Sequence, residues 1–459
     1  MEKTPAFHSP HALSLYQRIA ARSARTCVIG LGYAGLPLAV EFGRAGFTVL
    51  GIDTDKRKCN TINSGHSDIE DVPGAVVAAL VQTGTLRAVP EIGPADHPDT
   101  INICVPTPLR KTRDPDLSYV VSATQTVKTH LRPGMLVILE STTYPGTTQE
   151  IVRVILEETG LKAGSDFFLA FSPERVDPGN ASWNTGNVPK VVGGLTPDCT
   201  LLATALYQAA IDQVVTVSSP GAAEMVKLLE NTFRAINIGL VNEMALLCDR
   251  IGIDVWEVIE AATTKPFGFM PFYPGPGLGG HCIPVDPVYL SWKVKQAGLD
   301  TRFIDLAAEV NEAMPHHVVN KIADALNEHG KAIKGASILL MGVAYKRDVS
   351  DVRESPALDV MTLLLRKGAR VSYHDPFVPH LDAERWTGDR QMDSVTHSDT
   401  NVASADCVVV LTDHSGIDYD GLAATARLVV DARNAIRTRA PHIFRLGAPN
   451  PIAGPTRSG

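Results

Sequence analysis

Short apolar runs alternate with amphipathic stretches along most of the chain. From Arg25, an apolar run, a glycine turn, a helical stretch and a second apolar run ending at Asp53 follow one another. Similar apolar runs follow at 101–108 and 136–146. Because parallel strands need crossover helices, this alternation predicts a parallel sheet with helices on both faces, in an N-terminal domain over residues 24–215.

The pattern changes near residue 220. Between residues 222 and 252, apolar side chains recur at three- and four-residue steps, and no proline interrupts them. This spacing predicts a long helix with one apolar face. We expect it to form a spine between domains or subunits within a central helical region, residues 216–320. Its apolar positions include Met225, Leu228, Leu229, Phe233, Ile236 and Leu240.

Alternation resumes from Gly335, with apolar runs at 336–345, 369–376, 406–413 and 427–434 and a helical stretch at 355–367. It predicts a C-terminal domain over residues 330–445, with its own parallel sheet. The expected fold class is α/β, with two Rossmann-like doubly wound parallel-sheet domains joined by a long central helix. The tail after Phe444 is rich in Pro, Gly and Ser, and we expect it to be mobile.

Composition excludes several classes of protein. A chain of 459 residues with 44% hydrophobic and 20% charged residues is typical of a globular protein of two or three domains. A net charge of −8 without a basic run argues against nucleic-acid binding. No apolar stretch approaches the roughly 20 residues that cross a bilayer. The N-terminus lacks a signal-peptide pattern, which predicts a cytoplasmic protein without membrane contact.

The seven cysteines form no CxxC pair. An odd number without such pairs disfavours both a disulfide framework and a zinc site, so we predict reduced thiols and no metal. Most of these cysteines lie in segments that are predicted to form apolar strands or helices, where a cysteine is usually a small core residue. Those predicted to be core residues are Cys27, Cys104, Cys248 and Cys407, whereas Cys59 and Cys199 are interpreted as structural or incidental.

A GxGxxG motif at 30–35 follows the first predicted strand and opens a helix. In this context the glycines allow a tight turn and bring pyrophosphate close to the helix N-terminus. Asp53 ends the next strand, where a carboxylate accepts ribose hydroxyls and repels a 2′-phosphate, so NAD is favoured. Arg57 and Lys58 keep NADP as the alternative. A glycine turn that only packs helix on strand would leave Asp53 unexplained. The motif glycines are Gly30, Gly32 and Gly35.

The segment GPGLGGHCIPVDP, residues 275–287, places Cys282 in glycine-rich text. Gly279 and Gly280 remove side-chain bulk just before the thiol, which would let a ligand reach the sulfur. A structural turn cysteine is the alternative for an isolated case. The neighbouring His281 is a weak candidate for a base, because adjacent side chains usually point apart.

Other polar residues favour a functional thiol. Lys227 and Asn231 lie one turn apart on the predicted helix, where a lysine and an amide can stabilise an oxyanion. A solvated polar face is the alternative interpretation. Glu174 lies in a Pro- and Gly-bearing loop after a strand, a common place for catalytic groups. Asp286 can hold a water or the lysine in place.

A nicotinamide cofactor and a thiolate together suggest a specific chemistry. Hydride loss from a primary alcohol gives an aldehyde, which a thiolate traps as a thiohemiacetal. A second oxidation gives a thioester, and water releases the acid. The combination predicts a four-electron oxidation that uses two NAD molecules.

Eight segments occur in the order found in the UDP-glucose/GDP-mannose dehydrogenase family: GLGYAGLP, CVPTP, ESTTYPGTT, SPERVDPGN, EMVKLLENTFRAINIGLVNE, GPGLGGHCIPVDP, GVAYKRDVSDVRESPAL and VDARN. The chain resembles this family of nucleotide-sugar 6-dehydrogenases over residues 24–440. The resemblance implies an NAD domain, a helical dimerisation spine and a C-terminal domain for the UDP part of the substrate. It therefore implies a homodimer or a dimer-based oligomer.

The resemblance also implies roles for individual residues. Cys282 resembles the nucleophile, Lys227 and Asn231 the oxyanion stabilisers, and Asp286 the group that positions water and lysine. Glu174 and Thr143 resemble the pair that handles protons and water. The implied cofactor contacts are Gly30, Gly32, Tyr33, Ala34, Gly35, Asp53, Arg57, Pro106, Thr107, Thr143 and Arg353. The implied substrate contacts are Glu174, Arg175, Lys227, Asn231, Gly279, Lys346 and Arg433. A contact of Arg433 within its own chain and one across a dimer both fit the resemblance.

The sugar of the substrate is predicted from one departure from the family motifs. UDP-glucose members of the family often carry an acidic residue where this chain has Pro178. That departure resembles the branch that oxidises UDP-N-acetylhexosamines, and it predicts UDP-N-acetylglucosamine as the substrate. UDP-N-acetylmannosamine and UDP-glucose remain alternatives. So do a silent nucleotide-sugar or NAD sensor and a two-electron hydroxyacid dehydrogenase.

Overall fold

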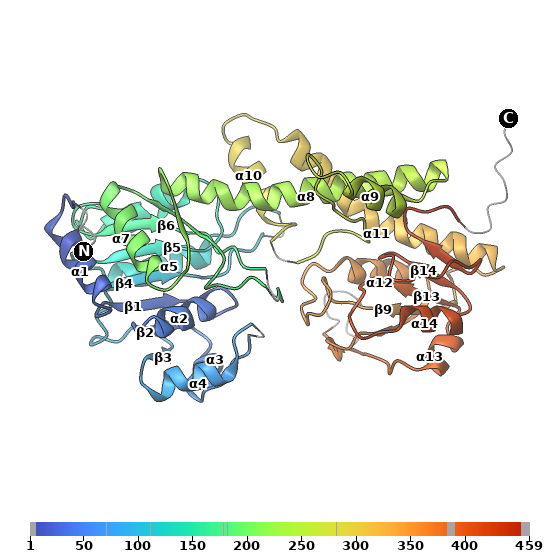
Figure 1. The fold of residues 1–459 in the computed structure, drawn as a ribbon, viewed down its shortest axis with the longest axis horizontal. Coiled ribbons are helices and arrows are strands. Elements are labelled where there is room, and N and C mark those ends of the chain that lie inside the picture. Colours follow the sequence, from blue (N-terminus) through green and yellow to red (C-terminus); the bar gives the residue numbers. More distant parts are fainter. Residues whose placement is uncertain are drawn as a thin grey trace. The chain divides into compact units, whose positions relative to one another are not determined.

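The computed structural model describes residues 6–69, 71–110, 112–177, 179–180, 182–280, 282–382 and 391–450. The chain divides into two compact units (Figure 1). The first contains the described residues up to Glu230 together with Val288–Leu299. The second contains Asn231–Pro287 and the described residues from Asp300 onward.

The first unit is built on an eight-stranded sheet with the order β3-β2-β1-β4-β5-β6-β7-β8. Strands β1 to β6 pair in parallel, as the alternation of apolar runs predicts, but β7 runs antiparallel to β6, and β8 runs parallel to β7. The strands are β1 (Arg25–Ile29), β2 (Thr48–Ile52), β3 (Leu86–Val89), β4 (Thr100–Ile103), β5 (Leu136–Leu139), β6 (Phe168–Phe171), β7 (Lys190–Gly194) and β8 (Val214–Val217).

Helices α1, α2, α4 and α7 share one hydrophobic core with the strands of this sheet. Helix α1 was not predicted, because its apolar stripe is short and its text resembles an unstructured N-terminus. It packs through Ala12, Leu15 and Ile19. The helices are α1 (Pro10–Ala20), α2 (Gly35–Arg44), α3 (Lys56–Asn63), α4 (Gly74–Gln82), α5 (Ser118–His130), the π-helix η1 (Thr148–Val152), α6 (Arg153–Glu157) and α7 (Pro197–Gln208).

The predicted long helix is observed as α8 (Pro220–Ile251), which is 32 residues long. Three further helices follow it, α9 (Val255–Thr263), α10 (Asp286–Lys295) and α11 (Arg302–Glu328). Apolar side chains spaced mostly four residues apart on α8 are exposed in the single chain. They are Met225, Leu229, Phe233, Leu240, Met244, Leu247 and Ile251.

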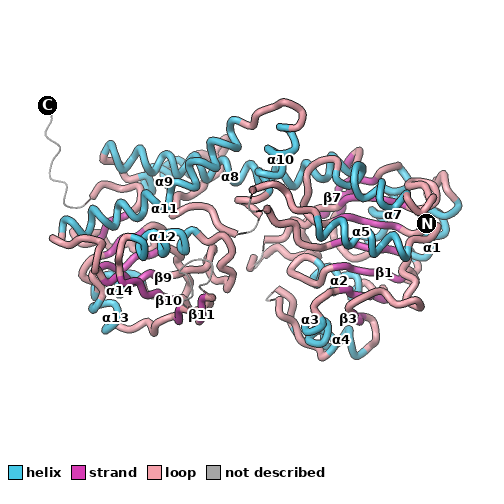
Figure 2. The backbone as a smooth tube through the Cα atoms, turned by 180° about the vertical axis from the view of Figure 1, so that it is seen from behind, coloured by secondary structure: helices cyan, strands magenta, loops and turns pink. Residues whose placement is uncertain are grey.

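The second unit contains a five-stranded parallel sheet with the order β10-β9-β13-β14-β15. Helices α11 and α12 pack against it through one core, and α13 and α14 through another, so helices cover both faces (Figure 2). The predicted α/β class with two sheets is confirmed. The elements are β9 (Ser337–Met341), α12 (Pro356–Arg366), β10 (Arg370–His374), β11 (His380–Leu381), β12 (Met392–Asp393), α13 (Asp399–Ser404), β13 (Cys407–Val410), α14 (Tyr419–Thr425), β14 (Val429–Asp431) and β15 (Ile443–Arg445).

The prediction of a mobile tail after Phe444 is wrong for residues 445–450. β15 pairs with β14, and Phe444, Leu446 and Ala448 are buried. The indole N–H of Trp256 also donates to the carbonyl of Leu446 at 2.8 Å. Backbone pairing and three buried apolar side chains order a segment that composition alone presents as a linker. Residues 451–459 lie outside the described part of the chain.

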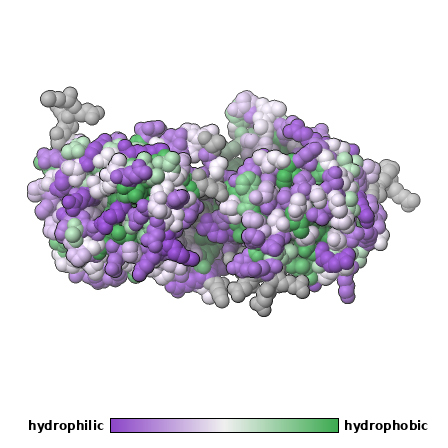
Figure 3. All heavy atoms as spheres, turned by 90° about the horizontal axis from the view of Figure 1, so that it is seen from below, coloured by the Kyte–Doolittle hydropathy of each residue, from purple (hydrophilic) through white to green (hydrophobic). Residues whose placement is uncertain are grey.

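Among the helices that the structure describes, none combines the length and apolar character of a membrane span. On the face drawn in Figure 3, hydrophilic and hydrophobic residues are interspersed on each unit.

Candidate active site

The glycine motif forms a tight turn between β1 and α2 in the first unit. Gly30 has a φ of +92°, and a Cβ added there would lie 2.5 Å from the carbonyl oxygen of Cys104. A Cβ at Gly35 would lie 1.8 Å from the carbonyl oxygen of Gly30. Both positions therefore require glycine. At Gly32, by contrast, nothing lies within 4 Å of an added Cβ, so this side of the turn is open to a ligand.

Asp53 lies directly after β2, with its side chain 13% exposed. One carboxylate oxygen accepts a hydrogen bond from the N–H of Leu31 at 3.0 Å, which ties the acid to the glycine turn. The other accepts from the N–H of Asp55 at 2.9 Å. These contacts orient the carboxylate and leave acceptor capacity for hydroxyl groups.

The basic residues that kept NADP as an alternative are engaged by acids. Lys58 forms an ion pair with Asp53 at 3.4 Å, and Arg57 donates to Asp55 at 3.2 and 3.1 Å. The turn, the open side at Gly32 and the carboxylate fit a dinucleotide, with pyrophosphate at the α2 N-terminus and ribose hydroxyls at Asp53. The donor and acceptor set favours NAD.

Replacing Asp53 with alanine tests this part of the site. We expect the Kd for NAD to rise about tenfold to a hundredfold, because hydrogen bonds to a charged group contribute roughly 1.5–3 kcal/mol. Asp55→Asn is the matched control, since asparagine caps α3 as well as aspartate does. Calorimetric titration of both variants with NAD gives the comparison. An unchanged Kd in the Asp53 variant would contradict the assignment.

Thr143 follows β5 and is fully buried. Its hydroxyl has no hydrogen-bond partner among the described residues. A buried hydroxyl without a partner is unfavourable, so this group is suited to a ligand or water. Thr107 lies after β4, and its carbonyl oxygen accepts a hydrogen bond from the hydroxyl of Tyr289 at 3.0 Å. Pro106, next to it, is exposed.

Glu174 lies three residues after β6, with its side chain 14% exposed. One carboxylate oxygen accepts from the N–H groups of Arg175 and Val176 at 2.7 and 2.9 Å, and the other from Lys190 at 3.3 Å. Burial opposes ionisation of this acid. Lys190, the two N–H groups and Lys227 nevertheless hold its pKa below the ordinary value.

Lys227 lies on α8 and is only 8% exposed. Its ammonium group forms no hydrogen bond or ion pair with any residue that the structure describes, although its positive charge lowers the pKa of Glu174. A buried cation is costly unless an anion accompanies it. Lys227 is therefore suited to an anionic ligand or intermediate.

Arg175 was predicted to contact substrate. In the structure, its guanidinium is engaged within the first unit, where it pairs with Glu230 at 2.6 Å and donates to the carbonyl of Pro189 at 2.6 Å. The contact between Arg175 and substrate stays a prediction.

In the second unit, the glycine-rich segment packs closely against the loop after β9. A Cβ at Gly279 would lie 2.7 Å from the Cβ of Tyr345, and one at Gly280 would lie 2.9 Å from its ring. The N–H of Gly280 donates to the carbonyl of Arg353 at 3.0 Å. These glycines thus make room for Tyr345, a packing role that sequence reasoning missed.

Cys282 begins the turn that leads into α10. Its carbonyl accepts a hydrogen bond from the N–H of Asp286 at 2.8 Å. The side chain of Asp286 in turn accepts from the amide of Asn231 on α8 at 2.5 Å. Asp286 and Asn231 are 4% and 7% exposed. The structure therefore brings Cys282, Asp286 and Asn231 into one cluster. His281 lies outside the described residues.

All seven cysteines belong to the described part of the chain, and none forms a disulfide. Cys282 is partly exposed and the other six are buried. Burial raises the pKa of each of these six thiols, which makes them poor nucleophiles. The six are Cys27, Cys59, Cys104, Cys199, Cys248 and Cys407.

Two arginines lie beside the glycine-rich segment. Hydrogen bonds to Asp351 raise the pKa of Arg353, with a smaller electrostatic contribution from Cys282, so the guanidinium and the thiol share one environment. Arg433 follows β14, and a Cβ at Gly275 would lie 2.6 Å from its Nη1. Burial lowers the pKa of Arg433 to about 10.

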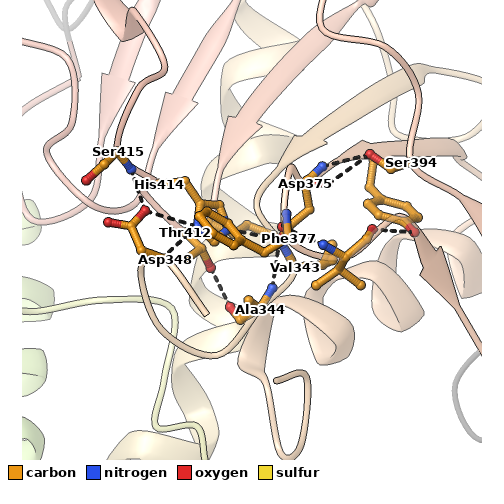
Figure 4. Close-up of polar contacts among 12 residues, drawn as sticks. Val343, Ala344, Asp348, Asp375, Phe377, Ser394, Thr412, His414 and Ser415 are labelled. Atoms are coloured by element: carbon orange, nitrogen blue, oxygen red, sulfur yellow. Dashed lines mark hydrogen bonds and ion pairs between the residues drawn. The ribbon is translucent and has the colours of Figure 1, made fainter. Parts of the chain in front are cut away.

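Lys346 lies in the loop after β9, where it is half-buried. A polar cluster that sequence reasoning missed fixes this loop (Figure 4). Asp375, at the end of β10, accepts from the N–H groups of Val343 and Ala344 at 2.7 and 3.0 Å. It also accepts from His414 Nε2 at 3.0 Å, and His414 Nδ1 accepts from the N–H of Asp348 at 2.9 Å.

The cluster has a visible sequence signal. The text HDP at 374–376 and TDHS at 412–415 each follow a predicted strand, and parallel strands end at the same edge of a sheet. His414 is buried between two acidic residues and links the ends of β10 and β13 to the β9 loop.

His414→Ala should destabilise the second unit by about 1–3 kcal/mol, because the variant leaves a buried carboxylate and an N–H group with fewer partners. Urea denaturation followed by fluorescence measures the change. His380→Ala is the control, since the imidazole of His380 is largely exposed and should matter little. Equal stabilities of the two variants would contradict a bracing role for His414.

The fold and the nucleotide cradle define a dinucleotide-binding α/β protein. Comparison with known proteins gives its family. Residues 24–211 match the NAD-binding domain of the UDP-glucose/GDP-mannose dehydrogenase family, residues 221–313 its central domain and residues 339–438 its UDP-binding domain. The chain belongs to this family of NAD-dependent nucleotide-sugar dehydrogenases.

Named relatives oxidise different sugars. The chain is 36% identical over 419 residues to the UDP-N-acetyl-D-mannosamine dehydrogenase of Pyrococcus horikoshii, which covers 90% of this chain and 96% of the relative. It is also 36% identical over 368 residues to the UDP-N-acetyl-D-glucosamine 6-dehydrogenase of Pseudomonas aeruginosa. This match covers 79% of this chain and 85% of the relative. The solved structure of the Pyrococcus horikoshii enzyme matches with a TM-score of 0.84 at 34% identity, over 92% of this chain and 99% of that one.

Proposed function

We propose that this chain oxidises the C6 hydroxymethyl group of a UDP-N-acetylhexosamine to a carboxylate. The overall change consumes the alcohol, one water and two NAD, and it releases the acid, two NADH and two protons. The observation that carries the proposal is the cluster at the start of α10. There, Cys282, the one partly exposed cysteine among the seven, lies in the same turn as Asp286. The carboxylate of Asp286 accepts a hydrogen bond from the amide of Asn231.

The bound NAD supplies a hydride acceptor, first for the alcohol and then for the adduct at the thiol. The chain supplies the other groups. The Cys282 sulfur adds to the C6 aldehyde, and the former carbonyl oxygen becomes an oxyanion that Lys227 and Asn231 stabilise. The burial of Lys227, which is 8% exposed, supports this role, because an oxyanion would compensate its charge. After the second oxidation, water attacks the thioester, breaks its C–S bond and returns the thiol.

Water for that last step needs polar groups that hold it. Glu174 offers a carboxylate acceptor, and the Thr143 hydroxyl is buried without a partner. Asp286 is fixed by Asn231 and can orient water or Lys227. We assign these three residues to water and proton handling, and Lys346, Arg433 and Gly279 to binding of the nucleotide sugar.

The sequence pattern favours UDP-N-acetylglucosamine, and the named relatives also support its manno epimer. A panel of UDP-glucose, UDP-N-acetylglucosamine, UDP-N-acetylmannosamine and the galacto epimers decides between them. We expect NADH formation and a product heavier by one oxygen and lighter by two hydrogens with an N-acetylated sugar. Turnover of UDP-glucose alone would overturn the substrate class. NAD binding with no turnover of any sugar would favour a sensor.

We also propose that the chain forms a dimer through the central region. The exposed apolar side chains spaced along α8 support this assembly, since an uncovered stripe of this kind is typical of an interface. Light scattering of the purified protein tests it. In this arrangement, residues 24–215 hold NAD, residues 216–320 form the dimer and residues 330–445 bind the UDP group.

A further inference from the structure

A buried charged network in the first unit has no role in the sequence-based account. Lys190, the first residue of β7, is 3% exposed. Its ammonium group pairs with Glu140 at 2.6 Å and with Glu174 at 3.3 Å. Although burial acts in the opposite direction, these two carboxylates raise the pKa of Lys190. The lysine therefore carries a fixed positive charge beside an acid of the candidate site.

The reversed direction of β7 explains how a strand lysine reaches this place. Ala170 pairs with Gly194 and Phe171 with Gly193 in the antiparallel ladder. If the same register is continued along the chain, Lys190 lies opposite Glu174. The start of β7 thus lies at the carboxyl ends of β5 and β6, where sites of open α/β sheets form.

Glu140 is anchored in turn. It follows β5, and its second oxygen accepts from the hydroxyl of Tyr207 at 2.6 Å and from the amide of Asn102 at 2.7 Å. Four elements, β4, β5, β7 and α7, therefore hold the ammonium group in one place. An ion pair that only stabilises the core would need Glu140 alone, yet Lys190 also reaches the half-buried Glu174.

We propose that Lys190 is a positioning residue that fixes the orientation and the negative charge of Glu174. Lys190 donates to one oxygen of the Glu174 carboxylate, and the N–H groups of Arg175 and Val176 donate to the other. Glu174 then presents only acceptor sites to water or a sugar hydroxyl, and it holds no proton in the resting enzyme. This inference rests on the proposed function, in which Glu174 handles water.

The other titratable groups around Glu174 come from the same unit. Lys227 on α8 acts in the same direction as Lys190, whereas the thiol of Cys104, after β4, interacts with Glu174 without adding a positive charge. Lys190 has the larger effect of the two lysines. Its removal should therefore raise the pKa of Glu174, because burial then outweighs the remaining donors.

The test compares Lys190→Met, Lys190→Arg and the double variant Glu140→Gln/Lys190→Met, in which position 140 no longer carries a buried charge without its cation. The protein is labelled with ¹³C at the glutamate Cδ, and the Glu174 signal is assigned by its absence in Glu174→Gln. We expect its titration midpoint to rise by about one pH unit or more in both methionine variants. It should stay near the wild-type value in Lys190→Arg. An unmoved midpoint in the methionine variants overturns the inference.

Steady-state rates add a second readout. kcat/KM of Lys190→Met at pH 5 should fall several-fold relative to its value at pH 8, while kcat/KM of the wild type changes much less over this range. An equal loss at both pH values would indicate a purely structural lysine and overturn the inference. The titration requires no turnover, so its failure is distinguishable from failure of the proposed oxidation. That second failure would appear as a wild-type enzyme that forms no acid.

Discussion

Cys282→Ser is expected to lower kcat by about three orders of magnitude or more, the range seen when a covalent nucleophile is removed. The hydroxyl of serine is a far weaker nucleophile than a thiolate toward the aldehyde. The variant should still bind NAD with the wild-type Kd, since Cys282 belongs to the second unit and the glycine turn to the first. Stopped-flow measurement of NADH formation gives the rate, and calorimetry gives the Kd.

Cys59→Ser is the matched control for this experiment. Cys59 is a buried cysteine whose thiol donates to the carbonyl of Asp53, a bond that serine can also make. Its kcat should stay within a few-fold of the wild type. If the Cys282 variant kept wild-type turnover to the acid, the thiol would not be the nucleophile.

Lys227→Met should lower kcat about a hundredfold to a thousandfold, with a smaller effect on the KM for the sugar nucleotide. The side chain keeps its length and loses its charge, so the oxyanion loses a cationic donor. Steady-state kinetics at saturating NAD measures both constants. Lys128→Met is the control, because Lys128 forms a surface pair with Glu158 that should have little effect. A loss of less than tenfold in the Lys227 variant would show that this ammonium does not stabilise the oxyanion.

Periodicity predicted much of the fold. Apolar runs that alternate with helical stretches predicted both sheets, and the spacing on α8 predicted a helix of the observed length. The direction of β7 was not predictable, because its apolar run KVVGG is the same for either orientation. Only the packing of β7 beside β6 decides the direction. The pairing of β15 was not predicted either. A three-residue strand in a Pro- and Gly-rich sequence has almost no local signal.

The candidate site shows the same limit. A glycine motif and an acid at the end of the next strand are local signals, and both residue sets lie where expected. Cys282 was recognisable by its unusual glycine-rich context. Lys190 was not recognisable, because a lysine in a strand is usually solvent-exposed. The polar segment around His414 is visible after a predicted strand, but it does not indicate that the histidine is buried. The burial and the partners of both residues arise from strands that meet only in the folded sheet.

The central claim is that one active site removes four electrons from C6 through a bond to Cys282. The most direct measurement counts NADH formed per sugar nucleotide consumed, in the wild type and in Cys282→Ser, at limiting sugar and excess NAD. The proposed mechanism predicts two NADH per sugar in the wild type and no more than one in the variant. One NADH per sugar in the wild type, or two in the variant, would contradict it.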